Sequence, residues 1–193
     1  MIRCYITDRH SLKHESLLDS IARNLRDGVT WIQIREKDLS ARDLHQLVQA
    51  AKALPNPHHT KFIVNSRIDV ALAAGADGAH FPAGSPEPRR WRGIAPNGFQ
   101  LGVSCHTPEE VAAAEREGAT YALFGPIFAP LSKTSPLAPH GIDGLASAAG
   151  CVRMPVLALG GITQVNTSAC IAAGAQGVAG ISLYLSEPAP AKI

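Results

Sequence analysis

The stretch Pro155–Ser182, PVLALGGITQVNTSACIAAGAQGVAGIS, decides the fold. An apolar run ends in the turn Gly160-Gly161, and a helical segment then leads to a second strand, Gly177–Ser182. Glycine lets a backbone approach a ligand closely, and the first residues of a helix have N–H groups without an intrahelical partner. Two such strand ends, one helix apart, predict a cradle for a phosphate. The alternative is that the two glycines only turn the chain, and the fold decides between these interpretations.

The same alternation of strand and helix extends outward over the whole chain. Eight short apolar or β-branched runs are predicted as strands: Arg3–Thr7, Thr30–Arg35, Lys61–Asn65, Gly78–Phe81, Gln100–Ser104, Tyr121–Phe124, Pro155–Leu159 and Gly177–Ser182. Between them apolar residues recur at helical spacing, as at Leu44, Leu47, Val48 and Ala51. Alternating strands and helices imply parallel pairing, and eight units favour a closed (β/α)8 TIM barrel over an open doubly wound sheet.

Capping signals support these helices. Three segments fit the capping-box pattern at helix starts: Ser40-Ala-Arg-Asp43, Ser66-Arg-Ile-Asp69 and Thr107-Pro-Glu-Glu110. Three Gly-Ala pairs, beginning at Gly75, Gly118 and Gly174, are predicted to end helices just before strands. A length of 193 residues is small for a barrel, so we expect a single domain over residues 1–193, short loops and a truncated last helix.

Composition excludes several classes of function. A formal charge of +2 without a long basic run gives no sign of nucleic acid or a membrane surface as partner. The N-terminus lacks the layout of a signal peptide, and the four cysteines lie far apart without a CxxC pair, so we expect a cytoplasmic protein with reduced thiols. Because the first strand is not followed by a Gly-x-Gly-x-x-Gly motif and the chain has no Gly-Lys-Ser/Thr, dinucleotide and P-loop sites are not favoured. Oligomeric state stays open, with a homo-oligomer as one alternative.

Polar residues at the predicted strand ends are the candidates for chemistry, because active sites of this fold lie at the carboxyl ends of the strands. The candidate substrate-binding residues are Gln33, Arg35, Lys37, Asn65, Ser104 and Lys133. Lys133 belongs to the longest connection, Phe124–Gly141, which we interpret as a lid. His80 and His106 are the histidines at strand ends, and each is either an acid or base or a hydrogen-bonding support.

A set of short motifs runs in order along nearly the whole chain: Tyr5-Ile6-Thr7-Asp8, Gln33-Ile34-Arg35-Glu36-Lys37, Ile63-Val64-Asn65, Gly75-Ala76-Asp77-Gly78-Ala79-His80, Gly102-Val103-Ser104, Phe124-Gly125-Pro126-Ile127-Phe128, Lys133, Leu159-Gly160-Gly161-Ile162 and Ala179-Gly180-Ile181-Ser182. Together they resemble thiamine-phosphate synthase and its relative, the thiazole tautomerase. This resemblance independently implies a (β/α)8 barrel. The synthase joins an aminomethyl-pyrimidine diphosphate to a thiazole phosphate and releases pyrophosphate.

The resemblance also implies roles for individual residues. Arg35 and Lys37 match the cations that bind the diphosphate, and His106 matches a histidine with a general acid/base role. The thiazole phosphate is expected on the last two glycine turns, at Gly160, Gly161, Gly180, Ile181 and Ser182.

The sequence departs from the synthase pattern where that pattern holds Mg²⁺. An Asn-Asp pair becomes Asn65-Ser66, and His-Leu-Gly-Gln-x-Asp becomes His80-Phe81-Pro82-Ala83-Gly84-Ser85. Hydroxyls therefore replace both carboxylates, and a hard dication loses the charge that binds it. We expect no metal and no other cofactor, with Mg²⁺ required only under the synthase alternative.

From these residues we predict a thiamine-biosynthesis barrel that binds thiazole phosphate and acts as a metal-independent thiazole tautomerase, an isomerase. In this reading His106 moves the proton and Arg35 holds the substrate carboxylate. The alternative is a thiamine-phosphate synthase, a transferase, with a degenerate magnesium site. A second alternative is a non-catalytic regulator that binds phosphate.

Overall fold

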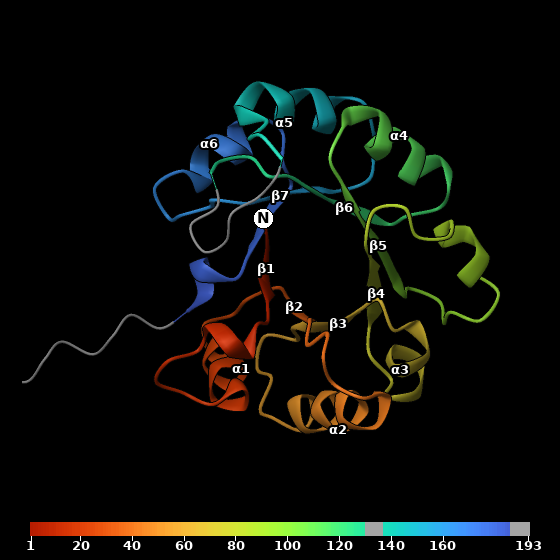
Figure 1. Ribbon diagram of the computed structural model, residues 1–193, viewed down its shortest axis with the longest axis vertical. Helices are drawn as coiled ribbons and strands as arrows, with labels where there is room; N and C mark the ends of the chain where they lie inside the picture. The colour runs from red at the N-terminus through yellow and green to blue at the C-terminus, as the bar shows by residue number, and fades with distance from the viewer. Residues whose placement is uncertain (130–136, 186–193) are drawn as a thin grey trace, which may run out of the picture.

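The predicted strands form one closed parallel barrel (Figure 1). The computed structural model describes residues 1–129 and 137–185. Each strand pairs with the next, and the last pairs with the first through Cys4 and Ala179. The strands are β1 Ile2–Ile6, β2 Trp31–Ile34, β3 Lys61–Asn65, β4 Gly78–Phe81, β5 Gln100–Cys105, β6 Tyr121–Phe124, β7 Val156–Leu159 and β8 Gly177–Gly180. The (β/α)8 prediction is confirmed, and the stretch Pro155–Ser182 does supply the seventh and eighth strands.

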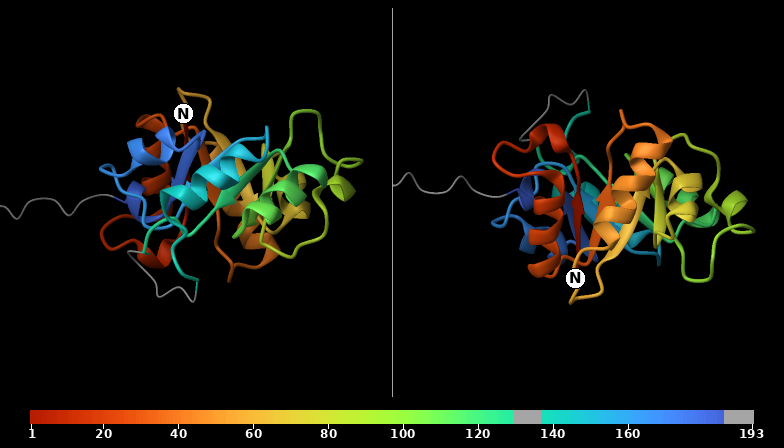
Figure 2. Two further views of the ribbon diagram at one scale, coloured as in Figure 1. Left: turned by 90° about the horizontal axis from the view of Figure 1, so that it is seen from above. Right: turned by 90° about the horizontal axis from the view of Figure 1, so that it is seen from below.

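All strands run in the same direction, which places their carboxyl ends together. In Figure 2 the N-terminus lies at one end of the barrel, where β1 begins. The loops that follow the strands lie at the opposite end, where the candidate residues of the sequence analysis are found. Within the described residues, no helix combines the length and the apolar character needed to cross a membrane.

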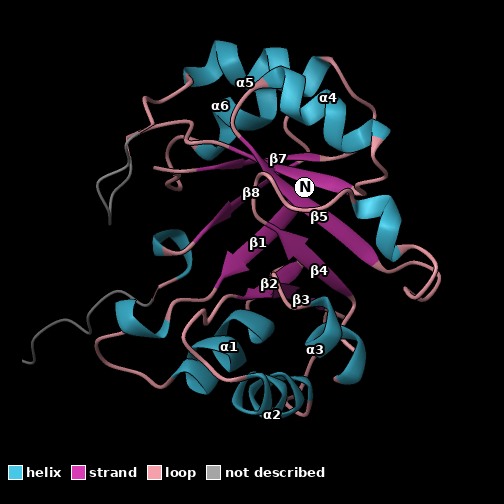
Figure 3. Cartoon of the chain, turned by 45° about the vertical axis from the view of Figure 1, so that its right-hand side comes forward, coloured by secondary structure: helices cyan, strands magenta, loops and turns pink. Residues whose placement is uncertain are grey.

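Helices form an outer layer around the barrel (Figure 3). They are α1 Leu17–Arg26, α2 Ala41–Lys52, α3 Ile68–Ala73, α4 Pro108–Arg116, α5 Gly141–Gly150 and α6 Thr167–Ala172, with the 3₁₀ helices η1 Arg9–Ser11, η2 Pro88–Trp91 and η3 Ser182–Tyr184. The connection from β4 to β5 carries only η2, because its prolines lack the N–H that an α-helix needs. After β8 the described chain contains η3 alone, and the tail over residues 187–193 lies outside the described residues.

Two of the three predicted capping boxes are confirmed. The hydroxyls of Ser40 and Thr107 accept hydrogen bonds from the backbone N–H groups of Asp43 and Glu110. The three predicted terminating glycines also hold, since Gly75, Gly118 and Gly174 have φ of 63°, 91° and 97°. Glycine tolerates this left-handed conformation, which closes the helix and releases the chain into the next strand.

The capping prediction for Ser66 is wrong. Ser66 adopts a left-handed φ of 62°, Arg67 is the N-cap of α3, and no side chain caps that helix. The Ser66 N–H donates to the carbonyl of His80 at 2.7 Å, and its hydroxyl accepts from Asn65 Nδ2 at 2.9 Å. The residue is thus tied to β4 and β3 instead of α3, while Asp69 forms an ion pair with Arg67.

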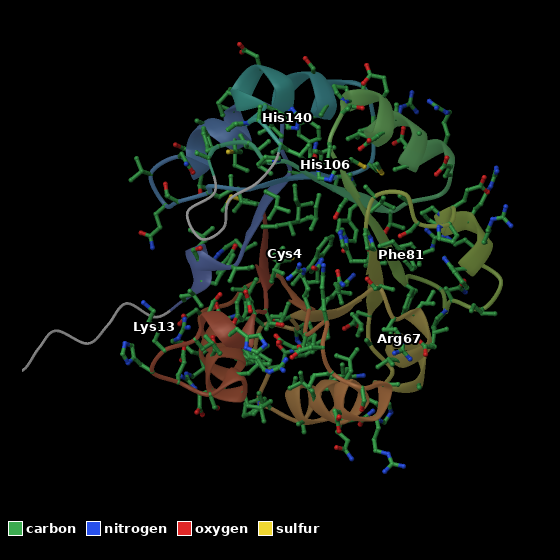
Figure 4. The ribbon with its side chains drawn as sticks, viewed as in Figure 1. Cys4, Lys13, Arg67, Phe81, His106 and His140 are labelled. Carbon is green, nitrogen blue, oxygen red and sulfur yellow. The ribbon has the colours of Figure 1, made fainter. Side chains whose placement is uncertain are left out.

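Strand side chains alternate between the helix layer and the barrel interior. The outward side chains pack against the helices, as Val64 does on β3 and Phe124 does on β6. The interior contains a separate cluster of Cys4, Ile6, Trp31, Tyr121, Leu123, Leu157 and Ala179. In Figure 4, Cys4 lies inside the ring of strands, whereas Lys13 and Arg67 lie outside it. The interior is therefore a packed core that is closed to solvent below the carboxyl ends of the strands.

Candidate functional site

The segment after β2 presents Arg35 and Lys37, and buried Glu36 between them anchors it. Thr7 Oγ1 donates to Glu36 Oε1 at 2.6 Å and accepts from the Arg35 N–H at 2.9 Å. Arg9 Nη1 reaches the second carboxylate oxygen at 3.1 Å. Because Glu36 is held from the end of β1, its two cationic neighbours stay at the carboxyl end of the barrel, with Lys37 exposed and Arg35 half-buried.

Gln33 and Ser104 project from β2 and β5, on the interior side of the barrel. Gln33 is buried, and its Nε2 has no hydrogen-bond partner among the described residues. Half-buried Ser104 lies with its Oγ 2.9 Å from His80 Nε2. His80 Nδ1 in turn lies 3.0 Å from the hydroxyl of Tyr121. Burial, and to a smaller degree the nearby charge of Arg35, lowers the pKa of His80 to about 3.

Two roles were open for His80 from the sequence alone, and Tyr121 was not predicted as a site residue. The structure makes His80 a hydrogen-bonded interior residue, because both ring nitrogens have hydroxyl partners. Tyr121 looked like an ordinary residue of an apolar strand. The available signal was Gly102, since a lone glycine within a strand often marks a close approach. A Cβ on Gly102 would lie 2.0 Å from the Tyr121 ring.

His106 lies at the turn between β5 and α4, as expected (Figure 4). Its Nδ1 is 2.6 Å from the carbonyl oxygen of Gly125, and its backbone N–H donates to Glu110 Oε2 at 2.6 Å. A carbonyl only accepts hydrogen bonds, so Nδ1 must carry the proton. In the neutral ring the lone pair is then on Nε2, which is the state that a general base requires.

The turn after β7 packs against the segment after β6. The N–H groups of Ile127 and Phe128 donate to the carbonyls of Leu159 and Gly160 at 2.9 and 3.0 Å. A Cβ on Gly160 would lie 2.8 Å from Pro126, and one on Gly161, whose φ is 62°, would lie 2.5 Å from the Ala129 carbonyl. Backbone packing therefore requires glycine at both positions. This reason for the two glycines differs from the phosphate cradle and the simple turn that the sequence suggests.

The remaining members of the predicted phosphate cradle lie directly beside this turn, because β7 pairs with β8. Gly180 ends β8, and Ile181 and Ser182 follow it. In the described part of the chain, the N–H groups of Gly161, Ile181 and Ser182 donate to no backbone acceptor. The two strand ends are neighbours in the barrel, and the use of these N–H groups as a phosphate cradle stays a prediction.

The expected magnesium positions lack a suitable donor set. Asn65 ends β3 half-buried, with its amide donating to the Ser66 hydroxyl, and Ser85 is half-buried in the connection after β4. Over residues 1–129 and 137–185, no three His, Cys, Asp or Glu side chains form a group that could hold a metal ion. Mg²⁺ binds through carboxylate oxygens, so these residues do not fit it.

Two further residues, Lys133 and Cys105, follow from the sequence as candidates near the ends of β6 and β5. Lys133 lies outside the described residues. Cys105 is buried in the outer core on the face opposite Ser104, and burial raises the pKa of its thiol to about 12. Because the thiolate is the reactive form, Cys105 is not a nucleophile here.

Comparison with known proteins supports one family. The family model described as thiamine monophosphate synthase matches residues 3–183. The thiamine-phosphate synthase of Roseiflexus castenholzii is 40% identical over 185 residues, which covers 96% of this chain and 81% of that protein. The thiamine-phosphate synthase of Moorella thermoacetica is 41% identical over 169 residues, covering 87% and 80%. The solved thiamine phosphate pyrophosphorylase from Pyrococcus furiosus is 33% identical with a TM-score of 0.81, covering 94% and 86%. The chain therefore belongs to the thiamine monophosphate synthase family.

Proposed function

We propose that this protein is a thiamine-phosphate synthase that couples a pyrimidine diphosphate to a thiazole phosphate and releases pyrophosphate. The observation that carries the proposal is the placement of two anion-binding groups at one mouth. Arg35 and Lys37 stand after β2, and the backbone donors of the β7 and β8 turns stand beside them across β1. One mouth thus offers a place for each of two phosphorylated substrates. The names of the relatives above favour this reaction over the tautomerase that the sequence analysis preferred.

The chain's own residues would act by binding and orientation. Arg35 and Lys37 would hold the diphosphate as it leaves, and Gly161, Ile181 and Ser182 would hold the thiazole phosphate through backbone N–H groups. Ser104 would donate a hydrogen bond to a substrate oxygen, and Gln33 and Asn65 would border the pyrimidine. Charge-assisted hydrogen bonds are worth about 1.5–3 kcal/mol each, so a few of them would retain a small phosphorylated ligand.

A coupling assay tests the proposal. We expect purified protein to form thiamine phosphate from the two halves. The coupling rate should rise with added Mg²⁺ only as far as metal bound to the diphosphate substrate contributes to the reaction. Arg35→Gln should raise KM for the diphosphate about 10-fold or more, the loss of one charge-assisted hydrogen bond. Arg42→Gln, which removes an exposed guanidinium from α2, is the matched control and should leave KM unchanged. Absence of product from the wild-type protein at any Mg²⁺ concentration would reject the synthase.

One observation favours a second candidate, the thiazole tautomerase. The described residues do not fit a carboxylate-held metal, whereas the N–H groups of Gly161, Ile181 and Ser182 donate to no backbone acceptor in the described chain and could bind a single phosphate. His106 would then be the base at Nε2, because its Nδ1 proton is committed to Gly125. Aromatisation of the thiazole tautomer by wild type, lost in His106→Ala with ligand binding retained, would select this candidate. A protein that binds thiazole phosphate but turns over neither substrate would be the non-catalytic regulator.

A further inference from the structure

A line of hydrogen bonds crosses the barrel interior and ends at the mouth. It runs from Tyr121 OH to His80 Nδ1, at 3.0 Å, and from His80 Nε2 to Ser104 Oγ, at 2.9 Å. Tyr121 and His80 are buried, and Ser104 is half-buried. The Tyr121 ring is fixed between Trp31, at a centroid distance of 4.7 Å, and the bare backbone of Gly102. The fold therefore gives this line a rigid inner end and an accessible outer end.

The chemistry of the groups sets the direction of these bonds. Because its pKa is lowered to about 3, His80 is neutral near pH 7 and carries one N–H. A phenol is a stronger acid than a neutral imidazole N–H, and an imidazole nitrogen accepts better than a phenol oxygen, so Tyr121 donates to Nδ1. The single ring proton is then on Nε2, which donates to Ser104. Ser104 accepts this bond and keeps its own proton for another partner.

Gln33 is a buried neighbour of Tyr121 on β2. Its Nε2, which only donates, is buried without a partner of ordinary geometry in the described chain. The side chain is nonetheless close enough to Tyr121 to oppose the rise in the pKa of that hydroxyl that burial causes. Among the described residues, the Tyr121 hydroxyl forms its hydrogen bond with His80 Nδ1, at 3.0 Å.

We infer that Tyr121 and His80 are positioning residues that fix the Ser104 hydroxyl as a hydrogen-bond donor to the substrate. The contact between Ser104 and substrate rests on the proposed function, whereas the direction of the hydrogen bonds does not. Without the Tyr121 hydroxyl, none of the described residues offers His80 Nδ1 a hydrogen-bond donor in its place. The ring is then free to hold its proton on Nδ1 and to accept at Nε2, which turns the Ser104 proton toward His80 and away from the substrate.

Imidazole ¹⁵N NMR of the ligand-free protein tests the direction without any substrate. The His80 signals are assigned by difference from His80→Gln. We expect the Nε2–H tautomer in the wild type and the Nδ1–H tautomer in Tyr121→Phe. Tyr5→Phe is the matched control, because Tyr5 makes a buried 3.1 Å bond to Ser20 outside the barrel interior and should leave the His80 tautomer unchanged. A wild-type Nδ1–H tautomer overturns the inference, even where Tyr121→Phe does not fold.

Kinetics then test the effect on Ser104. Tyr121→Phe should lower kcat/KM for coupling about 3- to 10-fold, as expected for one neutral hydrogen bond, and Tyr5→Phe should not. The double variant Tyr121→Phe/Ser104→Ala should match Ser104→Ala alone, because Tyr121 acts through Ser104. If the losses in kcat/KM of the two single variants instead add in the double variant, Tyr121 does not act through Ser104 and the inference is overturned. If the wild type catalyses no coupling, the proposed function fails while the NMR result still decides the direction of the hydrogen bonds.

Discussion

Adding one methyl group at Gly102 is expected to disrupt the barrel interior. A Cβ there would lie 2.0 Å from Cζ and 2.4 Å from the hydroxyl oxygen of Tyr121, far inside contact distance. The ring cannot retreat easily, because Trp31 packs on it with centroids 4.7 Å apart. Overpacking costs about 1–3 kcal/mol, and a displaced ring leaves buried polar groups without partners at about 1–3 kcal/mol. We therefore expect Gly102→Ala to lower the free energy of unfolding by about 2–6 kcal/mol.

Chemical denaturation followed by tryptophan fluorescence measures this loss. Gly93→Ala is the matched control: a Cβ at Gly93 meets no atom within 4 Å, so the free energy of unfolding should change by less than about 0.5 kcal/mol. In a Tyr121→Ala background the Gly102→Ala penalty should nearly vanish, because the clashing ring is gone. A Gly102→Ala loss below about 1 kcal/mol, or an equal loss in both backgrounds, would refute the argument.

Three further perturbations test other parts of the structure. Since the folded-state pKa of His80 lies near 3, below its unfolded value near 6.5, stability should fall by up to about 1.4 kcal/mol per pH unit as pH decreases from 6.5 toward 3. His80→Gln should remove this component of the pH dependence of unfolding. Thr7→Val takes the hydroxyl from buried Glu36 and should cost about 1–3 kcal/mol in thermal or chemical unfolding, whereas a cost near zero would mean that other donors suffice. Gly161→Ala should destabilise by about 1–3 kcal/mol, because its Cβ would lie 2.5 Å from the Ala129 carbonyl; unchanged stability would contradict the packing described.

Much of the fold could be predicted because its signals are local. Apolar periodicity located the strands, and glycines with positive φ, such as Gly75, marked the helix ends. Ser66 shows the limit of such reasoning: its spacing from Asp69 fits a cap, but a backbone bond to His80 on the next strand holds it in another conformation. A pattern within one segment does not report a competing partner from a distant one.

The candidate site divides in the same way. Strand-end positions such as Arg35 and His106 followed from the barrel order, because parallel strands bring their carboxyl ends together. The pairing of Tyr121 with His80 did not, since it joins β6 to β4 across the interior and depends on side-chain length and the missing Cβ of Gly102. The exchange of metal-binding carboxylates for hydroxyls was visible in the sequence, but it did not by itself choose between coupling and tautomerisation.

The close fit between the β7 turn and the segment after β6 has a consequence for engineering this barrel. Gly160 and Gly161 touch the backbone at Pro126 and Ala129, so neither loop can gain bulk alone. A side chain added at either glycine would cost about 1–3 kcal/mol of stability unless the facing backbone moves as well. The turn after β7 and the segment after β6 are therefore best exchanged between relatives as a pair, so that each keeps the backbone against which it packs.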